Sequence, residues 1–151
     1  MGNITIKSIT CLIFLTLTSC AATPVVIAPF DKTLTIEKSL DEVWPNLVRF
    51  LSTNDISIQT IEKESGLIQL NGENLSQGVL DQLCVASAGL LEIPMGGTAR
   101  GSITVFEDDT FSTISVNIRF SKISRFGDYA PTIADCQSRG VFETAVLNSV
   151  R

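Results

Sequence analysis

SITVFEDDTFSTISVNIRF, residues 102–120, is the stretch that decides the fold. Both of its halves alternate between apolar and polar residues: Ile103 and Val105 are apolar in the first half, and every second residue from Ile114 to Phe120 is apolar in the second. A period of two is typical of half-buried strands. The polar residues 108–110 between the halves predict a turn. The stretch therefore predicts two strands joined as a hairpin.

The residues upstream predict a strand, a helix and another hairpin. Residues 32–37 alternate as a strand does, whereas the apolar residues of 40–51 recur at helical spacing. Ser39 and Glu42 have the spacing of a capping box, which places the start of the helix at Leu40. Residues 56–61 and 67–70 are then expected to be strands, and Gly66 suits the turn between them.

Two stretches lack a clear period. Residues 71–101 have a short apolar middle between polar and glycine-rich ends, so we expect a short strand or helix near residues 79–86 and a turn or mobile loop at 94–97. Residues 121–135 are predicted to be irregular. A last helix is expected to open at residues 140–143.

This order of elements indicates the fold class. Strands joined by hairpins, together with two helices, favour an α+β two-layer sandwich. We expect one mostly antiparallel sheet with both helices packed on one face, forming a single domain over residues 32–151.

The N-terminus carries the pattern of a secretory signal. Lys7 precedes an apolar run from Ile9 to Leu17, and small residues follow. The sequence Leu17-Thr18-Ser19-Cys20 resembles the lipobox of bacterial lipoproteins. This resemblance implies that residues 1–19 are removed, that Cys20 receives diacylglycerol and N-acyl lipid, and that residues 20–31 tether the domain to a membrane. The alternative is an ordinary cleaved signal in which Cys20 is coincidental.

The residue after the cysteine bears on the location. Ala21 is not Asp, and similarity to lipoproteins of bacteria with two membranes then implies transport to the periplasmic face of the outer membrane. The run from Ile9 to Leu17 is far shorter than the roughly 20 residues that a membrane-spanning helix needs.

The cysteines divide into separate uses. Cys11 lies in the signal and Cys20 is the expected lipid site, which leaves Cys84 and Cys136. In an oxidising compartment this pair is expected to form a structural disulfide. The alternative, a redox or metal pair, lacks a Cys-x-x-Cys spacing and any histidine.

Charge and composition narrow the function. The chain has a net charge of −5 and loses Lys7 with the predicted signal, so the mature chain would carry −6. Nucleic-acid binders are usually basic, so no nucleic-acid partner is expected. Without histidine the usual general base is missing, and we expect no enzyme activity. The run Glu107-Asp108-Asp109 lacks the spaced ligands and glycine of a calcium loop, so no metal and no cofactor beyond the covalent lipid is expected.

One further resemblance concerns three short stretches. Residues 35–44 (TIEKSLDEVW), 56–58 (ISI) and 64–68 (ESGLI) are similar to the periplasmic domains of BamC-type (NlpB-like) lipoproteins. The resemblance implies a helix-grip α+β fold and a role in an envelope assembly.

Two functions are therefore expected. The first is a non-catalytic scaffold lipoprotein that binds an envelope protein, with contacts in residues 90–100 and 125–131 of the two irregular stretches. The candidate contact residues are Leu90, Leu91, Arg100, Arg125 and Tyr129. The alternative is a carrier of a small apolar ligand or lipid in a groove between the sheet and a helix.

Overall fold

The computed structural model describes residues 26–86, 89 and 91–151. Within this part of the chain there are seven strands and three helices. In chain order they are β1 (Thr33–Ile36), α1 (Leu40–Thr53), β2 (Ile58–Glu62), β3 (Leu67–Leu75), α2 (Gln77–Leu83), β4 (Cys84–Val85), β5 (Glu92–Asp108), β6 (Phe111–Phe126), β7 (Thr132–Ser138) and α3 (Val141–Ser149).

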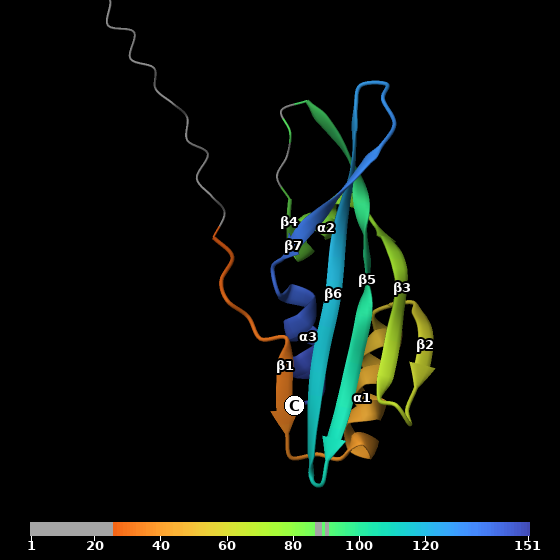
Figure 1. The fold of residues 1–151 in the computed structure, drawn as a ribbon, viewed down its shortest axis with the longest axis vertical. Coiled ribbons are helices and arrows are strands. Elements are labelled where there is room, and N and C mark those ends of the chain that lie inside the picture. Colours follow the sequence, from red (N-terminus) through yellow and green to blue (C-terminus); the bar gives the residue numbers. More distant parts are fainter. Residues whose placement is uncertain (1–25, 87–88, 90) are drawn as a thin grey trace, which may run out of the picture.

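The strands form one antiparallel sheet built around a long hairpin (Figure 1). The order across the sheet is β2-β3-β5-β6-β7-β4, and β1 also pairs with β6. The two halves of β6 have different neighbours on this edge: β1 lies beside Ser112 to Ser115, and β7 lies beside Phe120 to Ser124. The hairpin of β5 and β6 is therefore the spine of the molecule.

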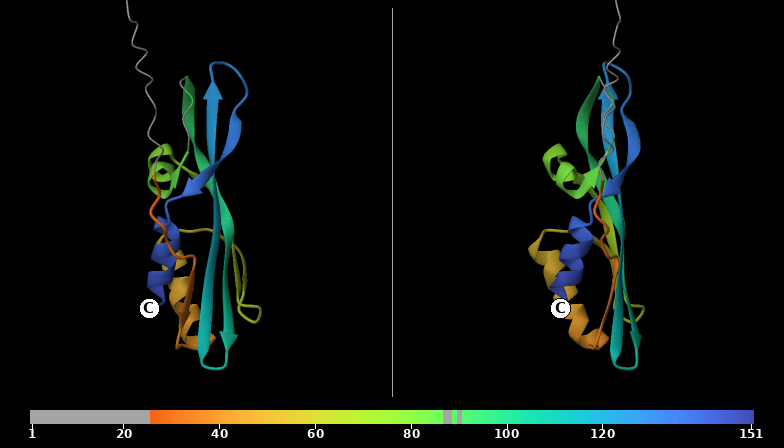
Figure 2. Two further views of the ribbon diagram at one scale, coloured as in Figure 1. Left: turned by 60° about the vertical axis from the view of Figure 1, so that its left-hand side comes forward. Right: turned by 90° about the vertical axis from the view of Figure 1, so that its left-hand side faces the viewer.

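The three helices lie on one face of the sheet and leave the other face open (Figure 2). The predicted α+β class with an antiparallel sheet is confirmed. The structure has three described helices where two were expected. The expected helices are α1 and α3, and α2 is the additional one.

Helix α1 begins where the capping box predicts. The Glu42 carboxylate accepts hydrogen bonds from the Ser39 backbone N–H at 2.9 Å and from the Ser39 hydroxyl at 3.1 Å. Glu107 of β5 accepts a further hydrogen bond from the free N–H of Leu40, at 2.8 Å. One face of α1 is buried against the sheet, namely Val43, Trp44, Leu47 and Leu51.

The core consists of two clusters of buried side chains. The larger one joins α1 and α3 to β3, β5 and β6. The smaller one lies under α2 and comprises Leu80, Cys84, Phe120 and Cys136. Half-buried side chains such as Ile118 and Phe142 touch both clusters.

The prediction of a loop at residues 94–97 is wrong. These residues belong to β5, and the register with β6 shifts between Pro94 and Gly97 at a β-bulge. A bulge accommodates a proline, which cannot donate to the ladder, and Gly96 has a positive φ of 90°. Gly97 allows close packing, because a Cβ there would lie 2.2 Å from the Ser121 carbonyl oxygen. The remainder of 71–101 is mostly regular too, since β3 extends to Leu75.

The prediction that residues 121–135 are irregular is also wrong. Strand β6 continues to Phe126, and β7 begins at Thr132. Apolar alternation stops at Phe120 because Lys122 and Ser124 take the next positions on the same face, yet both are buried. The ammonium of Lys122 pairs with the Glu92 carboxylate at 2.6 Å, which offsets the cost of burying a charge.

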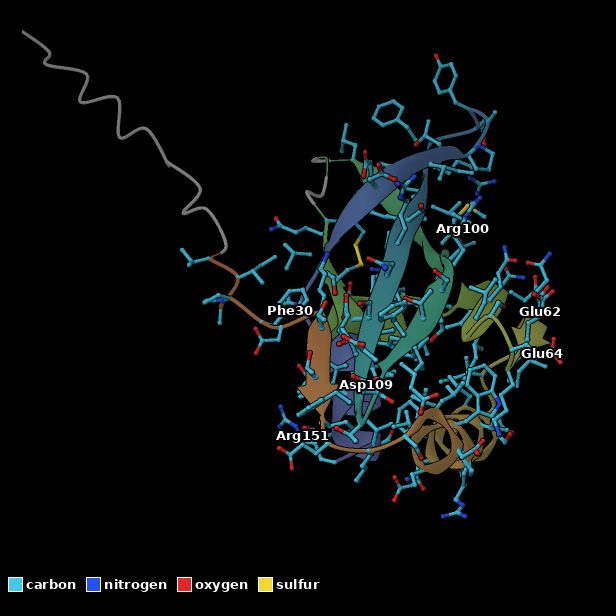
Figure 3. The ribbon with its side chains drawn as sticks, turned by 60° about the horizontal axis from the view of Figure 1, so that its bottom comes forward. Phe30, Glu62, Glu64, Arg100, Asp109 and Arg151 are labelled. Carbon is cyan, nitrogen blue, oxygen red and sulfur yellow. A yellow bond between two sulfur atoms is a disulfide. The ribbon has the colours of Figure 1, made fainter. Side chains whose placement is uncertain are left out.

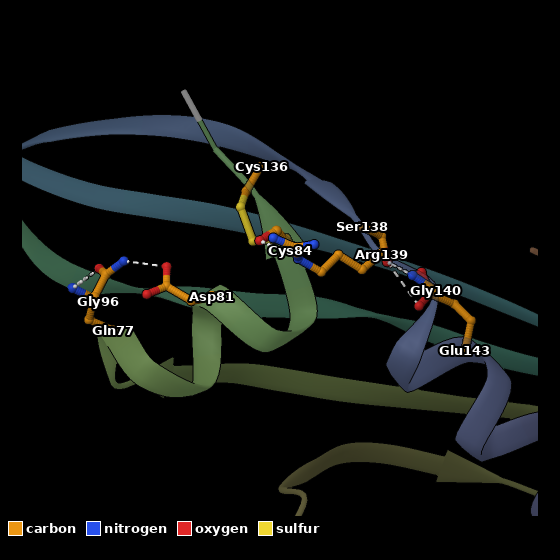
Figure 4. Close-up of a disulfide and its surroundings, with 9 residues drawn as sticks. All are labelled: Gln77, Asp81, Cys84, Gly96, Cys136, Ser138, Arg139, Gly140 and Glu143. Atoms are coloured by element: carbon orange, nitrogen blue, oxygen red, sulfur yellow. Dashed lines mark hydrogen bonds between the residues drawn. A yellow bond between two sulfur atoms is a disulfide. The ribbon is translucent and has the colours of Figure 1, made fainter. Parts of the chain in front are cut away.

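The disulfide between Cys84 and Cys136 is present, as predicted, with a Cα–Cα distance of 5.7 Å (Figure 4). It joins the end of α2 to β7, while the backbone of β4 pairs with β7 beside it. The Arg139 side chain donates to the Cys84 carbonyl oxygen at 3.4 Å, close to the disulfide. The disulfide therefore ties the smaller core cluster to the start of α3.

Candidate functional site

An apolar groove opens between the three helices and the sheet. Its volume is about 380 Å³. The floor is formed by β3, β5 and β6, and the walls by the end of α1, by α2 and by the start of α3. The lining residues are Phe50, Asn54, Asp55, Ile56, Leu70, Asn71, Leu75, Val79, Leu83, Ala99, Arg100, Ile118, Phe120, Val141, Phe142 and Ala145.

The groove exists because the helices do not cover the sheet completely. Helix α1 ends at Thr53, and α2 is only seven residues long. Between them the sheet and α3 contribute small side chains, Ala99 and Ala145. The large side chains of Val79 and Val141 are exposed at the edges of the groove. The groove therefore lies between the larger core cluster, which α1 covers, and the smaller one, which α2 covers.

The groove offers little chemistry beyond apolar contact. Apart from Asn54, Asn71, Asp55 and Arg100, the residues that line it are apolar. Among the described residues there is no cluster of three or more His, Cys, Asp or Glu side chains that could hold a metal ion. Pockets of a few hundred Å³ with mostly apolar walls and few polar groups are typical of sites for small molecules.

The sequence patterns identify the lining residues only as members of helices and strands. Val79 and Leu83 fall in a stretch for which the pattern leaves strand or helix open, and Val141 stands at the start of a predicted helix. No local signal could have revealed the groove, because it depends on how far apart three helices pack.

Several predicted contact residues are brought together at the other functional candidate, one end of the sheet. Leu91 directly precedes β5, Arg125 lies in β6, and Tyr129 lies in the turn that follows. Ile93 pairs with Arg125 across the two strands. Arg100 lies apart from them, in the middle of β5 and opposite Arg119 (its side chain is labelled in Figure 3). Leu90 and Cys20 lie outside the described residues.

The same end of the sheet carries a group of exposed apolar side chains, which we name the end patch. Its members are Leu91, Ile93, Met95, Phe126, Tyr129 and Ile133. The rings of Phe126 and Tyr129 lie with their centroids 6.1 Å apart. Ile133 falls outside the predicted contact stretches. It lies in β7, which begins within the residues that were predicted to be irregular.

An ion pair between a buried lysine and a half-buried glutamate supports this end of the molecule. The Lys122 side chain is 8% exposed and that of Glu92 is 32% exposed. The hydrogen bond from Lys122, followed by a backbone hydrogen bond from Gly89, holds the pKa of Glu92 below its ordinary value of 4.5. The carboxylate is thus stabilised in its charged form.

No family model matches this chain, and a search of curated proteins finds no significant similarity. None of the described helices has the length and apolar character needed to cross a membrane.

Proposed function

We propose that this chain is a lipid-anchored protein of the bacterial envelope whose domain binds a small apolar ligand in the groove. In this proposal Cys20 carries the lipid and holds the protein at the periplasmic face of the outer membrane. The domain acts as a non-catalytic binding module.

The observation that carries the proposal is the groove itself. Its 380 Å³ lies within the range of about 300–1,000 Å³ that is usual for ligand sites. Because its walls are mainly aliphatic and aromatic, they favour a hydrocarbon chain over a sugar or a nucleotide. Three polar side chains at the rim, Asn54, Asp55 and Asn71, leave room for a ligand with one polar end.

Binding of a fluorescent fatty acid tests the proposal. Dansylaminoundecanoic acid is to be titrated into the purified protein, and its emission should rise and shift to shorter wavelength as the chain enters the groove. The variant Ala145→Phe places a ring in the space next to α3 and should abolish this change.

A matched variant distinguishes the groove from other apolar surfaces. Tyr129→Ser alters the end patch, which is also exposed and apolar, and should leave dye binding unchanged. Circular dichroism must show that both variants are folded. Equal binding by the native chain and by folded Ala145→Phe would refute the groove as the site.

Docking of an envelope protein, the other predicted function, is the second candidate. The observation that favours it is the convergence of Leu91, Arg125 and Tyr129 at one end of the sheet. In-cell crosslinking followed by mass spectrometry, with Cys20→Ala as the control, would test it. A partner captured only when the lipid is present would support docking at the membrane.

A further inference from the structure

The end patch lies on a part of the sheet that extends beyond α1 and α3. Helix α2 lies at the base of this part, where the Gly96 N–H donates to Gln77 and Gly97 packs against Leu80. Residues 92–97 of β5, 121–126 of β6 and 132–135 of β7 form this part, which we name the arm (Figure 1). Three apolar side chains of the end patch are largely in solvent: Leu91 is 67% exposed, Tyr129 is 72% exposed and Ile133 is 67% exposed. Large exposed apolar side chains gathered at one end of a molecule mark a surface that contacts a partner or a membrane.

The N-terminal segment runs toward the same end of the molecule. Residues 26–32 lead away from the start of β1 in the direction of the arm and begin about level with α2 and β4 (Figures 1 and 2). Phe30 fixes this course, because its ring packs over Gly140 at the start of α3 (its place beside β1 is labelled in Figure 3). The path to Cys20 therefore starts beside the base of the arm.

The covalent reach of the tether is similar to the length of the arm. Five residues lie between Cys20 and Val26, and the six steps from one to the other, at about 3.3–3.6 Å each, span at most about 22 Å. From Phe120, in the smaller core cluster, to Phe126, β6 advances six residues, which at about 3.4 Å each makes about 20 Å. A lipid on Cys20 thus keeps the membrane within reach of the end patch.

The chemistry of the arm suits the interface of a bilayer. The ionisable groups beside the patch nearly balance: Arg125 and Asp128 have opposite signs, and Glu92 is paired with Lys122. Asp135, in the arm, leaves a net charge of −1. Tyrosine is enriched at membrane interfaces, where its ring is in contact with acyl chains and its hydroxyl with water.

The opposite end of the molecule provides a contrast. Phe106 and Phe111 are exposed there as well, at the β5–β6 turn. Three carboxylates, those of Glu107, Asp108 and Asp109, lie between them in the sequence. An anionic lipid surface repels such a cluster.

We propose that the end patch lies in the interface of the membrane to which the protein is anchored, so that a lipid surface covers it. The proposal rests on the lipid anchor at Cys20 and gives the anchored domain a fixed orientation, with the arm in the headgroup region. The groove, below the arm, then opens a short distance from the bilayer.

Tryptophan quenching by brominated lipid tests the proposal. The lipidated protein is to be reconstituted on vesicles of dibrominated phosphatidylcholine as two variants, Tyr129→Trp and Phe106→Trp. Trp44 is buried in the core and gives the same background in both. We expect the fluorescence of Tyr129→Trp to be quenched relative to vesicles without bromine, and that of Phe106→Trp to be unchanged.

Vesicle flotation of the same samples tests the lipid anchor separately from the contact between the end patch and the membrane. If the protein floats and neither variant is quenched, the anchor stands and the membrane contact is overturned. If the protein does not float, the anchor fails and the orientation that rests on it fails as well. A photocrosslinker at position 129 that captures one discrete protein in cells, rather than lipid, would also overturn the membrane contact in favour of protein docking.

Discussion

Arg100 and Arg119 are directly opposite each other on β5 and β6. Like charges in this position destabilise a sheet, because the two side chains project from the same face. Both residues are exposed, so the cost is modest and depends on salt.

We predict that Arg119→Thr raises the free energy of unfolding by about 0.2–1 kcal/mol, the range for one cross-strand pair. Urea unfolding at low ionic strength would measure it. Arg125→Thr is the matched control, since Arg125 also lies in β6 but is opposite Ile93. A smaller gain at high salt is expected, and a gain of equal size in the control would contradict the explanation.

A second prediction for a single residue concerns the carboxylate of Glu92. Its pKa is lowered in the folded protein, chiefly by the hydrogen bond from Lys122. The stabilisation from the charged carboxylate is therefore present above its ordinary pKa of 4.5 and is lost as the pH falls through the lower folded value. The variant Glu92→Gln lacks this contribution at every pH.

We accordingly expect the stability difference between the native chain and Glu92→Gln to shrink between about pH 6 and pH 3. Thermal unfolding across this range would measure it. Glu42, whose pKa is also lowered, by the backbone N–H and then the hydroxyl of Ser39, titrates in both proteins and cancels in the difference. A difference that is constant with pH would show that the ion pair contributes nothing.

At the scale of elements, the disulfide has the largest expected effect. It closes a loop between residues separated by 52 positions. By the chain-entropy estimate, a loop of this length corresponds to about 4 kcal/mol of stability. The elements that it joins, α2 with β4 on one side and β7 on the other, enclose the smaller core cluster.

We predict that the double variant Cys84→Ala, Cys136→Ala loses about 4 kcal/mol in denaturant unfolding, within the range for native disulfides. In hydrogen exchange, the loss of protection should concentrate in α2, β4 and β7. Helices α1 and α3 pack on the larger cluster and should remain protected. Equal loss in all three helices would show instead that the two clusters unfold as one unit.

For the whole molecule, the sequence predicts what depends on local signals. The capping box of Ser39 and Glu42 marks the start of α1, and the alternation up to Phe120 marks the spine of the sheet. The pairing of Cys84 with Cys136 follows from the small number of cysteines. The α+β class is a consequence of these signals in order.

The sequence suggests a groove between the sheet and a helix only as an alternative. Neither the residues that line the groove nor the arm can be predicted from it, because both depend on contacts between distant residues. A lysine such as Lys122 is expected at the surface, and its burial here depends on the ion pair with Glu92 of the neighbouring strand. Pro94 is typical of a loop, and only the bulge between β5 and β6 allows it to lie within a strand. The groove is a property of spaces between helices, which no single segment encodes.

The first strand of the domain pairs with residues far along the chain. Thr33 is opposite Ser115, and Thr35 shares a hydroxyl hydrogen bond of 3.0 Å with Thr113. During synthesis, β1 emerges before the other described strands and must stay unpaired until β6 has followed it. Pairing of β1 is therefore a late step in the folding of the sheet, and the hydroxyl pairs along this edge form only when most of the domain has been made.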